Sequence, residues 1–137
     1  MVYDSRIPAR EDCVLGRLLE RWALEKPDEE ALIFADGRQW SWSRVLELTR
    51  RVAAGLVDAG VQKGDHVLSW QPNCSEAILT WFGLNYIGAV YVPVNIAYRG
   101  SLLQHVVQLS DARLMICNSQ LAPLLNDIEL GDQLKDV

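Results

Sequence analysis

The sequence predicts an α/β domain, in which a short β-hairpin precedes a three-layer partial parallel sheet flanked by helices. Apolar runs of strand length recur three times with helix-period segments between them, at 66–70, 89–93 and 113–117. These runs are continuous rather than alternating, which is typical of strands that helices cover on both faces. Asp36-Gly37 lies between the β-prone runs 31–35 and 38–42 and indicates the hairpin.

Two helices frame this hairpin. The first, at 13–24, has apolar residues at helical spacing, with Asp12 as its N-cap and Pro27 preventing its continuation. The second, at 43–59, carries one apolar stripe and ends at Gly60, which is expected in the left-handed conformation. The stripe consists of Val45, Leu48, Val52, Leu56 and Ala59.

Further helices are expected between and after the parallel strands. The helix at 74–87 is apolar nearly all round, which predicts a central helix buried on several sides. Asn73, with Glu76 three residues on, forms a capping pattern at its start. Ser101 and Gln104 form a second capping box, which opens the next helix.

The chain is expected to form a single domain or subdomain over residues 1–137. Half of its residues are hydrophobic, which is enough to build a core. A last amphipathic helix is predicted at 119–128. The ends, 1–11 and 131–137, are expected to fray because they hold too few apolar residues to anchor them.

Charge and hydropathy exclude several classes of protein. Thirteen Lys and Arg residues against 18 Asp and Glu give a net charge of −5, which argues against a nucleic-acid surface. The most apolar stretch, 77–93, is interrupted by glycine, asparagine and proline and is shorter than the roughly 20 residues of a membrane span. The first residues lack the apolar core of a signal peptide. Cys13, Cys74 and Cys117 are few and scattered, which fits the reducing cytoplasm.

The carboxyl ends of the strands are where a doubly wound sheet binds ligands. Here they carry Gln71-Pro72-Asn73, Val94-Asn95 and Asn118-Ser119. None offers a carboxylate pair, a nucleophile with a base, or a phosphate loop, and neither GxxxxGK[ST] nor GxGxxG occurs. We therefore assign no catalytic, cofactor-binding or metal-binding residue.

Isolated residues that attract notice have structural interpretations. His66 is expected at a strand edge and His105 on a helix surface, rather than as ligands or bases. Cys74 and Cys117 are expected to be small buried hydrophobes. Core packing is favoured over ligand stacking for the five tryptophans, which are Trp22, Trp40, Trp42, Trp70 and Trp81. The role of Trp81 is left open.

Two stretches of the sequence resemble the adenylate-forming acyl-CoA synthetases. The first starts at Trp40-Ser41-Trp42 and continues to Lys63-Gly64-Asp65. The second and more specific one joins Pro72-Asn73-Cys74-Ser75-Glu76 to the box Gly88-Ala89-Val90-Tyr91-Val92-Pro93-Val94-Asn95. The resemblance runs in register from about residue 13 to 120. The pieces from Trp81 to Ala89 are most similar to carnitine or crotonobetaine CoA ligases.

This resemblance implies a fragment of the large N-terminal domain of an acid–thiol ligase. Such an enzyme joins a carboxylate, here a fatty or carnitine-like acid, to the α-phosphate of Mg-ATP and then transfers the acyl group to CoA, releasing AMP. ATP, Mg and CoA belong to that parent enzyme, and none is expected in this chain, because a Ser-Gly-Thr-Thr-Gly run and a Tyr-Gly-Xaa-Thr-Glu box are absent. The expected role is an inactive scaffold whose partner is the remainder of the synthetase, and the acyl substrate stays open.

Two other functions remain in view. One is a stand-alone interaction module, a truncated paralogue that pairs with a synthetase subunit. The other is an independent flavodoxin-like nucleotide-binding domain, which the lack of carboxylates at the strand ends disfavours. A homodimer through an exposed sheet edge or apolar face is expected, since such surfaces favour self-association.

Overall fold

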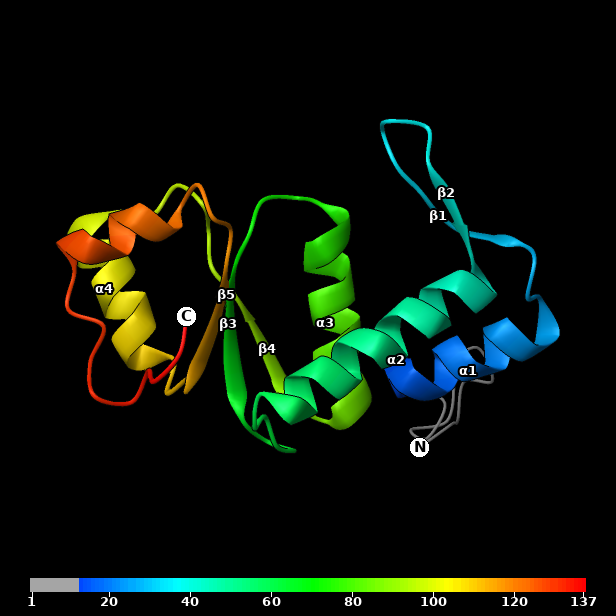
Figure 1. Cartoon of the computed structure of the whole chain (residues 1–137), viewed down its shortest axis with the longest axis horizontal. Coiled ribbons are helices and arrows are strands. Elements are labelled where there is room, and N and C mark those ends of the chain that lie inside the picture. The colour runs from blue at the N-terminus through cyan, green and yellow to red at the C-terminus, as the bar shows by residue number, and fades with distance from the viewer. Residues whose placement is uncertain (1–12) are drawn as a thin grey trace, which may run out of the picture.

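The computed structural model describes residues 13–137, which form three layers (Figure 1). A three-stranded sheet lies in the middle, with α2 and α3 on one face and α4 with a short 3₁₀ helix on the other. The elements are α1 (Leu15–Glu25), β1 (Glu30–Ile33), β2 (Gln39–Ser41), α2 (Trp42–Asp58), β3 (His66–Trp70), α3 (Ser75–Ile87), β4 (Val90–Pro93), α4 (Gly100–Leu109), β5 (Leu114–Cys117) and the 3₁₀ helix (Ala122–Asp127). The predicted α/β class, hairpin and parallel sheet are confirmed.

The sheet has the strand order β4-β3-β5, and all its pairs are parallel. In the register, His66 lies opposite Val90 and Val67 lies opposite Leu114. From β3 the chain passes through α3 to β4 on one side of β3. From β4 it crosses back through α4 to β5 on the other side of β3. Two right-handed crossovers in opposite directions place α3 and α4 on opposite faces, as Figure 1 shows.

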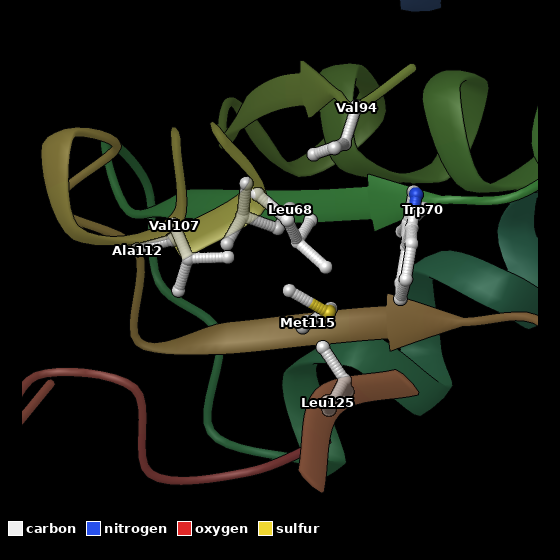
Figure 2. Close-up of a cluster of buried hydrophobic side chains, with 8 residues drawn as sticks. Leu68, Trp70, Val94, Val107, Ala112, Met115 and Leu125 are labelled. Atoms are coloured by element: carbon white, nitrogen blue, oxygen red, sulfur yellow. The ribbon is translucent and has the colours of Figure 1, made fainter. Parts of the chain in front are cut away.

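Each face of the sheet has its own apolar core. The core under α4 is built from Leu68, Trp70, Val94, Leu103, Val107, Ala112, Met115 and Leu125 (Figure 2). The core under α2 and α3 contains Leu56, Val61, Val67, Leu84 and Ala89. Adjacent residues of β3 therefore enter different cores, which explains why the strand is continuously apolar.

The caps differ from those expected. Asp12 lies outside the described residues, and Val14 is the N-cap of α1, without a side-chain cap bond. Cys74 rather than Asn73 is the N-cap of α3. Arg99 rather than Ser101 is the N-cap of α4. The capping-box interpretation of Ser101 was wrong because the side chain expected to complete it, Gln104, accepts a hydrogen bond from the backbone of Glu129.

The apolar helices are less covered than their sequences suggest. On α2 the buried residues are Val45, Thr49, Ala53 and Leu56, so the buried face is rotated from the expected stripe, and Ala59 is exposed. On α3 only Ser75, Thr80, Gly83 and Leu84 are buried, and the rest of its apolar surface is at least partly open. The expectation of a helix buried on several sides was therefore wrong for this chain.

A close approach joins α2 and α3. A methyl group added at Gly83 would lie 2.8 Å from Cγ1 of Val52 and 3.3 Å from the backbone nitrogen of Ala53. Glycine is needed there to let the two helices meet. Gly60 and Gly88 have φ of 87° and 79°, so both helices stop in the left-handed conformation expected of glycine.

The C-terminal quarter departs most from expectation. The last helix is a short 3₁₀ helix with proline in its first turn, rather than an α-helix over 119–128. The final residues are held against the sheet: Lys135 N donates to Arg113 O, and Met115 N donates to Asp136 O, each at 3.0 Å. The expectation that 131–137 frays does not describe this arrangement.

Candidate functional site

The candidate site lies at the carboxyl ends of β3 and β4. Two adjoining hollows, of about 400 and 410 Å³, share Asn73, Ala77 and Tyr91 in their linings. The first is completed by Ile33, Phe34, Ala35, Cys74, Ile78 and Trp81, and the second by Ser69, Gln71, Pro72, Pro93, Val94, Asn95 and Ile96. We call their union the neutral groove, because none of these residues is charged.

The polar end of the neutral groove is formed by side chains engaged with the local loops. Ser69 Oγ donates to Gln71 Oε1 at 2.9 Å. The Asn95 side chain accepts from the Ala97 amide at 2.9 Å, and the carbonyl of Asn95 accepts from the indole nitrogen of Trp70 at 3.2 Å. Hydroxyl and amide groups bind by hydrogen bonds, but they do not ionise near neutral pH and so are poor general acids or bases. This end is suited to binding rather than to acid–base catalysis.

The other end of the neutral groove is aromatic and open. Trp81 stacks obliquely on Phe82 and Tyr91, with ring centroids 5.2 and 6.4 Å apart. Its side chain remains 45% exposed, and Ile33 at the tip of β1 is 67% exposed. Together they form an apolar surface that residues 13–137 leave open.

The backbone pairing between β3 and β5 continues at the carboxyl ends of these strands. At this topological switch point, doubly wound sheets open to receive ligands. Here Asn118 N donates to Trp70 O at 3.1 Å, which extends the pairing one residue past the end of β5. The nearby Arg99 is held by the carbonyls of Ile96 and Tyr98 and lies 5.9 Å from the Trp70 ring. Its guanidinium therefore stabilises the loop after β4.

The residues singled out in the sequence lie in different parts of the fold, with the exception of two pairs. His66 Nδ1 lies 2.7 Å from Ser110 O at the opposite end of the sheet, and His105 is exposed on α4. Of the five tryptophans only Trp70 is fully buried. Cys74 and Cys117 are half-buried thiols rather than fully buried ones, and burial raises the pKa of the Cys117 thiol. Cys74 and Trp81 meet in the first hollow of the neutral groove, and Trp22 stacks on Trp42 with ring centroids 5.9 Å apart.

A charged cluster that sequence reasoning missed ties three helices together. Glu20 Oε1 on α1 accepts from the Tyr86 hydroxyl on α3 at 2.6 Å and from Arg50 on α2 at 3.0 Å. Arg50 Nε also donates to the Tyr86 oxygen at 3.0 Å. These hydrogen bonds hold the pKa of Glu20 below its usual value, and the bond from Tyr86 has the largest effect. The partners are 30 to 66 positions apart, so no local pattern could reveal them.

The neutral groove does not fit a nucleotide, and the described residues do not fit a metal site. Over 13–137, no group of three or more His, Cys, Asp or Glu side chains could hold a metal ion. The neutral groove has no cation for phosphate and no carboxylate for ribose. We therefore derive no step through ATP, Mg or CoA in this segment. No helix in the described part of the chain is long and apolar enough to cross a bilayer.

Comparison with known proteins decides the family. The AMP-binding enzyme family matches residues 19–136. The chain belongs to the AMP-binding enzyme family. The crotonobetaine/carnitine–CoA ligase of Salmonella paratyphi A is 36% identical over 109 residues, which are 77% of this chain and 21% of that protein. Acyl-CoA ligase sidI of Aspergillus fumigatus is 34% identical over 105 residues, 76% of this chain and 18% of its own.

Solved structures of this family share the fold. The N-terminal domain of FACL13 from Mycobacterium tuberculosis superposes with a TM-score of 0.81 at 24% identity, covering 89% of this chain and 32% of that domain. The family match and the CoA-ligase relatives confirm the acyl-CoA synthetase resemblance seen in the sequence motifs. The chain spans about a fifth of the length of the two curated relatives.

Proposed function

We propose that this chain is the N-terminal scaffold of an ATP-dependent acyl-CoA synthetase and contributes no catalytic side chain to it. The enzyme would adenylate a carboxylate and transfer the acyl group to CoA with release of AMP. Membership of the AMP-binding family and the names of two CoA-ligase relatives support this reaction class. A fatty or carnitine-like acid is the proposed substrate class, and the reducing cytoplasm is the proposed compartment.

The observation that carries the scaffold role is the neutral groove. In a family defined by nucleotide chemistry, this segment places only amides, hydroxyls and apolar groups at the carboxyl edge of its sheet. Adenylation requires fixed positive charge where negative charge develops on phosphate. The groups that do this work must therefore come from outside the segment.

The test is a direct assay of the purified chain with Mg-ATP, CoA and a panel of fatty acids and carnitine. We expect no AMP or pyrophosphate above background, whereas the Salmonella ligase under the same conditions serves as the positive control. Acid-dependent AMP formation that co-purifies with the folded chain would refute the scaffold role.

We further propose that the remainder of the AMP-binding domain packs on the neutral groove. The solved N-terminal domain of FACL13 is about three times longer than the part that this chain covers. Trp81 and Ile33 offer that remainder an exposed apolar surface, and the absence of charge in the groove favours a neutral, apolar face. Burying such surface contributes about 25 cal/mol per Å².

A second candidate function uses the same surface. An interaction module that pairs with a separate synthetase subunit would also present an open aromatic groove, and a second copy of the chain is a competing occupant. Light scattering measures the mass of the isolated chain and of its Trp81→Glu variant in solution, and so tests whether a second copy occupies the groove. Self-association that Trp81→Glu abolishes, but that Leu109→Glu on α4 keeps, would assign the groove to a homodimer instead.

A further inference from the structure

The hairpin of β1 and β2 stands apart from the three-stranded sheet. Its two strands form a sheet of their own, and Figure 1 shows them projecting beyond the helices. No residue of either strand is buried, and Ile33 is 67% exposed. A two-stranded hairpin is at best marginally stable in water, because a stable sheet needs a third strand or a helix packed against it. The hairpin therefore lacks part of the packing that stable sheets have.

Local contacts hold the hairpin in shape. Near the turn, Phe34 N donates to Arg38 O at 2.9 Å. At the base, Trp42 N donates to Glu29 O at 3.1 Å. The rings of Phe34 and Trp40 meet edge to face, with centroids 4.7 Å apart. These contacts define the path of the two strands, but they give the hairpin no core.

One residue on each strand directs its backbone away from the hairpin. Ile33 and Gln39 lie opposite each other in the register. Backbone groups of successive residues in an antiparallel pair alternate in direction, and the next residue, Phe34, points inward to Arg38. The N–H and C=O of Ile33 therefore face the outer side of β1, and those of Gln39 face the outer side of β2. Among residues 13–137, no strand lies beside either outer side.

Only one of these two strands borders the neutral groove. Ile33, with Phe34 and Ala35 after it, lines the first hollow together with Trp81. No residue of β2 lines either hollow. The unpaired edge of β1 is therefore continuous with the surface on which the remainder of the domain is proposed to pack.

From this geometry we propose that an extended segment of the remainder of the AMP-binding domain adds to the outer edge of β1 and makes the hairpin a three-stranded sheet. This inference rests on the proposed function, because it needs that remainder. The N-terminal domain of FACL13, about three times as long as the part that this chain covers, has the length to supply such a segment. The segment would bond the N–H and C=O of Ile33 and place neutral side chains beside Trp81.

The test compares hydrogen exchange at two amides in two proteins. One protein is the full chain, and the other is a chimaera in which residues 19–136 replace the matching segment of the Salmonella crotonobetaine/carnitine–CoA ligase. We expect the Ile33 amide to exchange about tenfold more slowly in the chimaera, because it gains a hydrogen bond. The Gln39 amide on the other edge should be unchanged. No slowing at Ile33 overturns the proposal, and so does an equal or larger slowing at Gln39.

Proline variants test the same edge by mutation. Ile33→Pro removes the outward N–H, Ile33→Ala shortens the side chain but keeps that N–H, and Gln39→Pro alters the opposite edge. In the chimaera, we expect the Phe34 amide to exchange about tenfold faster with Ile33→Pro than with Ile33→Ala. Gln39→Pro should act alike in the chimaera and in the full chain. A difference between Ile33→Pro and Ile33→Ala that is as large in the full chain would overturn the added strand.

A third variant separates this proposal from the packing on which it rests. Trp81→Glu reports groove packing, since it should lower the melting temperature of the chimaera more than Leu109→Glu on α4 does. That result with unchanged Ile33 exchange leaves the packing in place and overturns the added strand. Neither effect overturns both. If the chimaera does not fold, the same amides are compared in the full chain mixed with the rest of the ligase expressed separately, and no slowing at Ile33 there overturns the proposal.

Discussion

The contact between α2 and α3 gives a prediction whose sign is decided by geometry. Substituting Ala for Gly in a helix normally stabilises it by about 1 kcal/mol, because glycine has the larger backbone entropy to lose. At Gly83 the new methyl group would lie 2.8 Å from Val52 Cγ1, and such overpacking costs about 2 kcal/mol. Gly83→Ala should therefore lose about 1 kcal/mol, which for a domain of this size lowers Tm by roughly 4 °C.

Gly55 on α2 is the matched control. A methyl group at Gly55 meets nothing within 4 Å, so only the helix propensity acts, and Gly55→Ala should gain up to about 1 kcal/mol. Urea or thermal unfolding followed by circular dichroism measures both variants. In the double variant Val52→Ala/Gly83→Ala the contact with Cγ1 is gone, and we expect a favourable coupling of about 1 kcal/mol. Two stabilising substitutions, or no coupling, would refute the close approach.

Three further changes test other parts of the fold. Thr49 Oγ1 is buried without a hydrogen-bond partner, so Thr49→Val should raise the free energy of unfolding by about 1 kcal/mol. A clear fall in that free energy would show that the hydroxyl is hydrogen-bonded. Hydrogen bonds from Tyr86 and Arg50 lower the pKa of Glu20 in the fold, so their stabilisation is present above about pH 4.5 and is lost as pH falls through the lowered value. Glu20→Gln should cost about 0.5 kcal/mol at pH 7, since the pair is half exposed, and the difference from wild type should vanish in acid; a pH-independent difference would contradict this. Gly60→Ala should cost about 1 kcal/mol because φ is 87°, and an unchanged Tm would exclude strain there.

The sheet could be predicted from the sequence because its signals are local. The strand predicted at 66–70 coincides with β3, because a short continuous apolar run is typical of a strand that is covered on both faces. Gly60 and Gly88 marked the helix ends because a left-handed backbone is inexpensive only for glycine. These features depend on one residue and its neighbours.

The parts that could not be predicted depend on contacts distant in sequence. Gln104 was expected to serve its own helix, but Glu129 uses its side chain instead. The residues after the 3₁₀ helix pair with the edge of β5, and no pattern within 119–137 shows this pairing. The apolar face of α3 predicted burial, and under the proposed function the remainder of the domain supplies it.

The polar residues of the candidate site could be placed from the sequence, but the grouping of its apolar residues could not. Gln71, Asn73 and Asn95 were placed at strand ends from the sequence, and the structure brings them to the polar hollow of the neutral groove. The aromatic hollow could not be foreseen, because it joins Ile33 and Phe34 of the hairpin region to Trp81 of α3. The role of Trp81, left open by the sequence, is now proposed as a contact for the remainder of the domain.

The most direct test of the scaffold role is a chimaera. Residues 19–136 of this chain replace the matching segment of the Salmonella crotonobetaine/carnitine–CoA ligase, and CoA-ester formation is measured over a panel of acids. We expect a folded, active chimaera with the acid preference of the recipient, and loss of activity with Trp81→Glu in the groove. A folded chimaera that has lost all activity, or that has acquired a new acid preference, would contradict the claim that this segment supplies structure and no chemistry.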